Sequence, residues 1–119
     1  MNKQRRKEIA KAVAMLTDAR GLMEEASAAA AEAKDMLETA RDEEQEYKDN
    51  MPENMQDGDK GQMADSAIDN LEQAASSAES FIDALDESVS SIQEVIDKLE
   101  GDATFGMYEA ENAADAATE

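Results

Sequence analysis

The chain has 119 residues, of which only 3% are aromatic, and its formal net charge is −19. It contains no cysteine and no histidine, which excludes disulfides, thiol or imidazole catalysis and the common zinc and haem ligand sets. Its apolar residues recur at regular intervals and are mostly Ala, Leu, Ile and Met, which is typical of long helices. We therefore expect a single all-α domain over residues 1–119.

The beginning of the chain is basic and the remainder is acidic. Five of its 11 Lys and Arg residues fall within residues 1–11. We interpret this basic segment as a solvated terminus, the alternative being a partner for acidic residues in an antiparallel oligomer. No apolar run approaches the roughly 18 residues of a membrane span, and no signal-peptide segment follows Lys7. We expect a soluble cytoplasmic protein with no membrane contact.

A seven-residue repeat of apolar positions predicts a first helix over about residues 4–47. A row of alanines at this spacing ends at Tyr47 and favours close approach of a partner helix. A further row widens the apolar stripe beyond what a two-stranded coil needs, which favours a bundle of three or four helices. The three rows are Ile9, Leu16, Met23, Ala30 and Leu37; Ala12, Ala19, Ala26, Ala33 and Ala40; and Met15, Leu22, Ala29 and Met36.

The segment 48–59 is predicted to be a turn. It holds the only proline of the chain, Pro52, which should end the first helix because it pushes the preceding residue out of the α region. Gly58 offers a tight turn, and Asp59 with Gln62 has the spacing of a capping box. We expect the polar side chains of Asn50, Glu53, Asn54 and Gln56 to satisfy backbone groups of the turn. The alternative is that this tip is a recognition surface.

The second helix is predicted over about residues 60–100, and its heptads are the more regular ones. Gly101 is expected to end it. A flanking row, Ala67, Ala74, Phe81 and Val95, again widens the apolar stripe. The residues expected to pack against the first helix are Ile68, Leu71, Ile82, Leu85, Val89, Ile92, Ile96 and Leu99.

Folding at the turn makes a long antiparallel helical hairpin with apolar surface left over. We expect two copies to cover this surface by forming a four-helix bundle. The alternative is a monomeric hairpin closed by the acidic tail, residues 101–119. In that tail Thr104 is placed to cap a short helix carrying Phe105, Met107 and Tyr108. The tail is expected to dock on the bundle, the alternative being that it holds a partner.

The sequence shows no catalytic constellation, and we expect neither an enzyme nor a bound cofactor or metal. Residues 57–62 lack most ligands of a calcium loop. The remaining signal is rows of carboxylates on the second helix, which predict either a surface that mimics nucleic acid for a basic protein partner or simple solubility. Direct nucleic-acid binding is disfavoured by the same charge. The expected partner-binding residues are Asp65, Asp69, Glu72, Glu79, Asp83, Asp86, Asp97 and Glu100.

The turn from Asn50 to Gln56, with the pattern N-x-P-E-N-x-Q, resembles that of small acidic helical proteins of uncharacterised function encoded by bacteriophages and prophages. In that group such a turn joins two long helices. The resemblance implies a small phage-type protein that acts in the host cytoplasm. Proteins of that size and acidity often bind and block a host nucleic-acid-handling or defence protein, and this is the function we expect. The alternative function is a self-assembling scaffold or chaperone-like bundle whose working surface is the apolar stripe.

Overall fold

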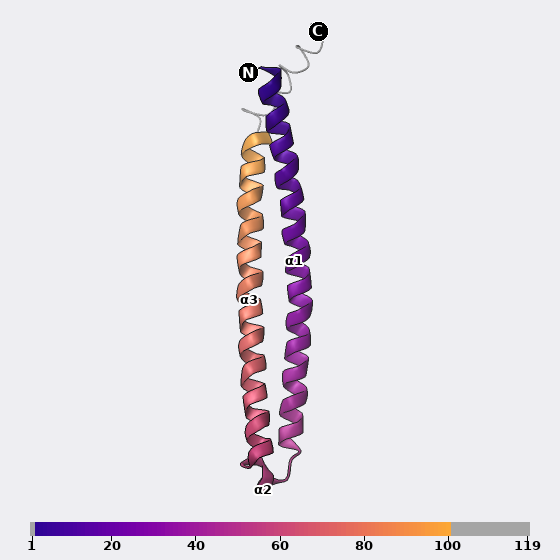
Figure 1. The fold of residues 1–119 in the computed structure, drawn as a ribbon, viewed down its shortest axis with the longest axis vertical. Coiled ribbons are helices and arrows are strands. Elements are labelled where there is room, and N and C mark those ends of the chain that lie inside the picture. Colours follow the sequence, from indigo (N-terminus) through magenta and orange to yellow (C-terminus); the bar gives the residue numbers. More distant parts are fainter. Residues whose placement is uncertain (1, 101–119) are drawn as a thin grey trace. The chain divides into compact units, whose positions relative to one another are not determined.

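The computed structural model describes residues 2–100, which form three helices (Figure 1): α1 over Lys3–Asp49, α2 over Glu53–Gln56 and α3 over Asp59–Glu100. No strand occurs in this range. The prediction of an all-α helical hairpin is confirmed, and the ends of the two long helices fall within two residues of their predicted positions. The predictions for Gly101, Thr104 and the tail concern residues outside this range.

The chain divides into two compact units. Within residues 2–100, the first unit combines Asn2 and residues 3–25 of α1 with residues 85–100 of α3. The second unit combines residues 26–49 of α1, the turn with α2, and residues 59–84 of α3. Each unit contains a pair of antiparallel helices.

In the first unit, α1 begins with a side-chain cap. The carboxamide oxygen of Asn2 accepts a hydrogen bond of 2.8 Å from the backbone N–H of Arg5, which satisfies one of the free donors at a helix start. The apolar contact between the helices buries Val13 of α1 and Ile96 of α3. The predicted packing residues Leu85, Val89, Ile92 and Leu99 are half-buried in this unit.

In the second unit, small residues let the helices approach closely. Ala64, Ile68 and Ala75 of α3 are buried, and Leu71 and Ile82 are half-buried beside them. On α1 the corresponding face carries half-buried residues at the predicted seven-residue spacing, Ala30 and Leu37. Alanine at the contact shortens the distance between helix axes, so the apolar core of this unit is narrow.

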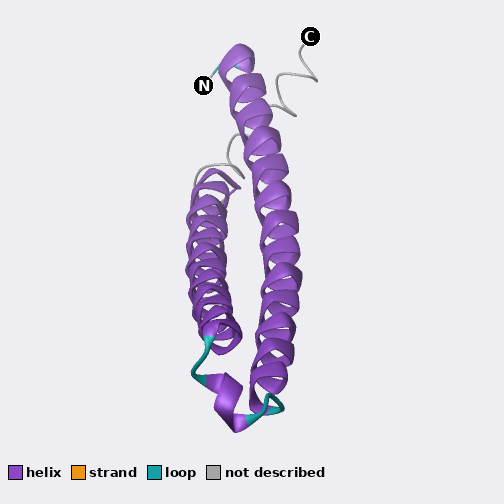
Figure 2. Ribbon diagram, turned by 60° about the horizontal axis from the view of Figure 1, so that its bottom comes forward, coloured by secondary structure: helices purple, strands orange, loops and turns teal. Residues whose placement is uncertain are grey.

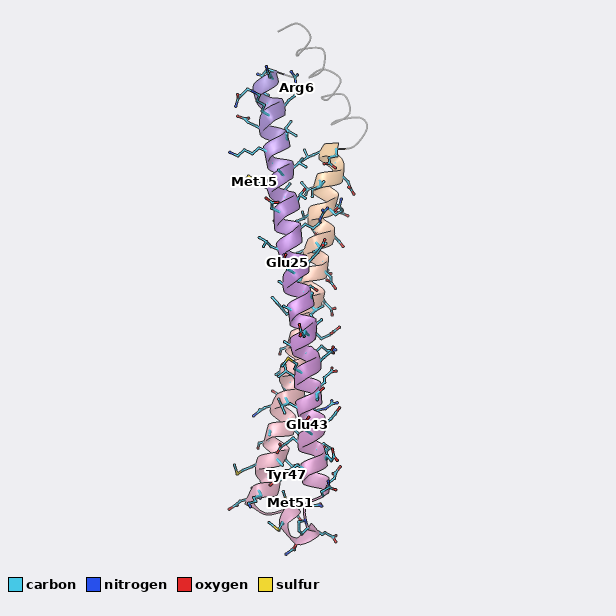
Figure 3. The ribbon with its side chains drawn as sticks, turned by 90° about the vertical axis from the view of Figure 1, so that its right-hand side faces the viewer. Arg6, Met15, Glu25, Glu43, Tyr47 and Met51 are labelled. Atoms are coloured by element: carbon cyan, nitrogen blue, oxygen red, sulfur yellow. The ribbon has the colours of Figure 1, made fainter. Side chains whose placement is uncertain are left out.

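The turn contains a short helix that the sequence analysis did not predict (Figure 2). Pro52 precedes α2 with φ of −51°, and its carbonyl accepts a hydrogen bond of 2.8 Å from the N–H of Met55. A proline fits this position because its fixed φ suits the start of a helix and it has no N–H to leave unpaired. Met51 is buried just before it, and Figure 3 shows Met51 and Tyr47 near the end of α1.

The prediction that four polar side chains satisfy backbone groups of the turn holds for Gln56 but not for the other three. Gln56 does bond to the backbone, since its side-chain amide donates to the Met51 carbonyl at 3.0 Å. Asn50, Glu53 and Asn54 are exposed, and within residues 2–100 their side chains make no such bond.

The predicted capping box of Asp59 and Gln62 is also absent from the structure. Asp59 lies inside the first turn of α3, and the side chain of Gln62 donates to the Asp57 carbonyl at 3.2 Å. The physical reason is that α3 begins at the glycine turn itself: the N–H of Gln62 already bonds to the carbonyl of Gly58 at 2.9 Å.

Gly61 fixes how closely α2 and α3 approach each other. It is buried, and a Cβ atom built on it would lie 1.7 Å from the carbonyl oxygen of Gln56. Its backbone is not in the left-handed region, since no glycine among the described residues has a positive φ. Glycine is therefore required here for space and not for conformation.

Candidate interaction surfaces

One side of the second unit carries ion pairs between the two long helices. The Nζ atom of Lys34 lies 3.2 Å from Glu79 Oε2, and Lys48 forms an ion pair with Asp65. Between these two pairs, the negative charge of Glu72 favours the charged form of Arg41. The three bases are seven residues apart on α1, and the three acids are seven residues apart on α3. We call these six residues the charged edge: Lys34, Arg41, Lys48, Asp65, Glu72 and Glu79.

Two bases of the charged edge, Lys34 and Arg41, also interact with carboxylates of α1. Hydrogen bonds to Glu38 and then to Glu79 raise the pKa of Lys34 above its usual value. A hydrogen bond to Asp42, at 2.8 Å, raises the pKa of Arg41. These side chains are partly exposed, so water and salt weaken the attraction. The pairs therefore define the register of the helices more than they add stability.

The charged edge is flanked by further carboxylates and is acidic as a whole. Asp69 and Asp83 follow Asp65 and Glu79 by four residues, which places them on the neighbouring strip of α3, and both are exposed. Glu38 flanks the edge on α1, with an oxygen 3.2 Å from Lys34 Nζ. Three bases thus face six carboxylates on this side of the second unit.

In the first unit the same antiparallel register holds with different chemistry. Arg20 donates a hydrogen bond to the side-chain oxygen of Gln93. Gln93 continues the seven-residue spacing of Asp65, Glu72 and Glu79 and is neutral where those residues are acidic. Gln93 in turn donates to Asp97 at 2.8 Å. Asp86 and Glu100, the other predicted sites in this unit, are exposed.

The bases of α1 are what the sequence analysis missed. It expected the rows of carboxylates on α3 to be available to a partner, but Asp65 and Glu79 already pair with bases of the other helix. The signal was present, because Arg20, Lys34, Arg41 and Lys48 all fall on one seven-residue row. Asp69 and Asp83 form no ion pair with a base within residues 2–100, and Asp69 accepts a hydrogen bond of 2.9 Å from the side chain of Gln73.

The other side of the second unit is apolar. On α3, a step of two residues from each acid of the charged edge reaches Ala67, Ala74 and Phe81, and this step turns about 200° around the helix. Phe81 is 53% exposed, and on the same side Met63 is 71% exposed and Met36 of α1 is 68% exposed. We call these six residues the apolar edge: Met36, Met63, Ala67, Ala74, Phe81 and Ala29.

A hollow of about 520 Å³ lies at the turn end of the apolar edge. Its walls come from both helices, with Tyr47 and Glu44 on α1 opposite Lys60, Met63 and Ala67 on α3, and Ala64 beneath them. The first unit has its own exposed apolar residues, Met15, Leu22 and Val95. Figure 3 shows Met15 extending from α1. The extra apolar rows noted in the sequence are thus left uncovered by a single chain.

Among residues 2–100, no group of three or more acidic side chains converges in a way that would hold a metal ion. No helix in this part of the chain combines the length and the apolar character needed to cross a membrane. No known protein family, curated protein or solved structure matches this chain.

Proposed function

We propose that this protein is a non-enzymatic binding protein whose charged edge occupies a basic surface of another protein. The observation that supports it is the surplus of carboxylates: three bases of α1 are outnumbered by six acids on the same side of the second unit. The bases are engaged in pairs within the chain, so the field that an approaching protein meets is negative. Asp69 and Asp83 are exposed and form no ion pair with a base of residues 2–100, so their charges contribute to that field.

A surface of this kind has the charge spacing to compete with nucleic acid. Carboxylates three or four residues apart on a helix lie about 5–6 Å from one another, while each strand of a duplex carries a phosphate about every 3.4 Å along its axis. The turn that resembles those of phage proteins supports a target in the host cytoplasm, namely a nucleic-acid-handling or defence protein. The expected outcome of binding is inhibition of that protein.

This proposal is tested by displacement of labelled duplex DNA from a panel of purified bacterial DNA-binding and restriction proteins. The native chain should release DNA from at least one of them. The double variant Asp69→Asn with Asp83→Asn should do so roughly tenfold less well, because charges facing a partner contribute strongly to association. Glu32→Gln with Glu46→Gln removes the same charge, at the same fourteen-residue spacing, from exposed positions of α1 that lie off the charged edge, and should have little effect. Equal losses in both variants, or no displacement at all, would overturn the proposal.

A second candidate function is assembly, with the protein acting as a structural, scaffolding or chaperone-like bundle through its apolar edge. The observation that favours it is the exposure of Met36, Met63 and Phe81 on one side of the second unit. Exposed large apolar side chains that gather in one place mark contact surfaces. Light scattering should then show an assembly whose mass is indifferent to salt, since apolar contacts are not screened.

A further inference from the structure

We propose that the apolar edge of the second unit binds the same edge of a second copy of the chain. In this contact the two α3 helices run antiparallel, and Phe81 of each copy enters the hollow beside Ala67 of the other. The inference rests on the second candidate function and specifies its partner and its contact. Two hairpins joined in this way would form the four-helix bundle expected from the sequence.

The carboxylates of α3 in the second unit all lie toward one side of the helix. Between Lys60 and Ala84 the helix carries five carboxylates, all on the charged edge or on the strip flanking it: Asp65, Asp69, Glu72, Glu79 and Asp83. The opposite side of the same stretch contains none: Lys60, Met63, Ala67, Asn70, Ala74, Ser77, Phe81 and Ala84. Two chains of net charge −19 repel each other, and this strip brings them together with no carboxylate of α3 in the contact. The carboxylate that lines the hollow, Glu44 of α1, lies opposite Lys60.

The same strip carries an exposed aromatic side chain and a hollow that can receive one. Phe81 is 53% exposed, and the hollow of about 520 Å³ beside Ala67 and Met63 is large enough for an aromatic ring. Phe81 and Ala67 are fourteen residues apart, or about 21 Å along the helix. A two-fold axis at Ala74, midway between them, brings each Phe81 to the hollow of the other copy. Such a contact is self-complementary, as two-fold symmetry requires.

The residues between the two contact points allow the helices to come close. Asn70, Ala74 and Ser77 are small and exposed, and small side chains at a crossing reduce the distance between helix axes. Tyr47 forms a wall of the hollow, so the incoming ring also finds an aromatic neighbour from α1.

A second copy fits this surface better than an unrelated partner does. A basic protein is drawn to the charged edge and not to a strip whose only charge is Lys60. Phe81 and the hollow lie at a fixed distance from each other on α3. A second α3 running in the opposite direction presents its hollow to this Phe81 and its own Phe81 to this hollow. In the resulting dimer both charged edges face outward and stay available to another protein.

Single-cysteine variants test the contact directly, because the native chain has no cysteine. Ala74→Cys places a thiol on the proposed two-fold axis, where two copies bring the sulfurs within the short range that a disulfide needs. Mild oxidation should cross-link it into a dimer at least tenfold faster than Ser76→Cys. Ser76 is exposed two residues further on and faces the other side of α3. Equal cross-linking of the two variants, or none in either, would overturn the proposal.

The direction of the helices has its own test. Phe81→Cys should cross-link with Ala67→Cys when the two variants are mixed, and poorly with itself. Rapid self-linkage of Phe81→Cys would show parallel helices and contradict the proposed contact. Phe81→Ala, a change at an exposed position, should raise the dimer dissociation constant in sedimentation experiments at least tenfold while helix content is kept.

The outcomes separate this contact from the functions on which it rests. A salt-independent assembly that Phe81→Ala leaves intact would contradict the contact and keep the assembly function. A chain that remains monomeric at every concentration would contradict both. Displacement of DNA by the charged edge is measured independently of either result.

Discussion

At the scale of single residues, two glycines in helices play different roles. Gly21 lies in α1 with nothing within 4 Å of the position of an added Cβ, whereas an added Cβ at Gly61 would meet the Gln56 carbonyl. Gly21→Ala should stabilise the protein by up to about 1 kcal/mol, the difference in helix propensity. Gly61→Ala should destabilise it by about 1–3 kcal/mol because α2 must shift. Urea unfolding followed by circular dichroism measures both, and a stabilising Gly61→Ala would contradict the described turn.

Lys34 gives the charged edge a dependence on pH. Its pKa is raised above 10.5 by Glu38 and Glu79, so its charged form is favoured by folding. That contribution is complete below pH 10.5 and is lost as the pH rises through the folded value. The stability difference between the native chain and Lys34→Gln should be constant from about pH 7 to pH 9 and shrink at higher pH.

Lys60→Gln is the control for this prediction, because Lys60 is exposed and forms no ion pair within residues 2–100. Its stability difference from the native chain should change little over the same range of pH. Urea midpoints at each pH provide the comparison. A difference for Lys34→Gln that grows at high pH would show that its pKa is lowered by folding, contrary to the geometry.

At the scale of helices, two consecutive residues of α3 differ sharply in burial, because one packs in the helix contact and the other lies at the surface. Ile96 is 3% exposed, and Val95 next to it is 45% exposed. Ile96→Ala should cost about 2–4 kcal/mol through lost contacts and a cavity, while Val95→Ala should change stability by less than about 0.5 kcal/mol. Thermal and urea unfolding measure the pair. Similar costs for both would mean that Val95 is covered in solution.

The helices were predictable because their signals are local. Heptad spacing defined α1 and α3, and Pro52 ended α1. The short helix α2 was missed because four residues are too few to show a periodicity. The role of Gly61 depends on the approach of a neighbouring backbone, which no sequence pattern reports. The acidic residues of α3 were recognised as rows, but their pairing with Lys34 and Lys48 depends on the register between helices.

At the scale of the whole molecule, the sequence separates two kinds of surface. In the second unit the bases of α1 meet acids of α3 on one side, and the exposed apolar residues of the apolar edge lie on the other. Self-association through the apolar edge would double the number of charged edges presented outward, and paired sites raise the effective affinity for a target with two basic surfaces. The two proposals are therefore compatible, and each can fail alone.

The most direct test of the charged edge as the working surface is the salt dependence of DNA displacement, measured by fluorescence anisotropy against whichever protein of the panel the native chain inhibits. Binding through carboxylates predicts that the affinity of this chain for that protein falls at least tenfold between about 50 and 300 mM salt. It also predicts a shallower decline for Asp69→Asn with Asp83→Asn. An affinity that is unchanged over this range, and equal for native and variant chains, would contradict the account and leave the acidic residues as an ordinary solvated surface.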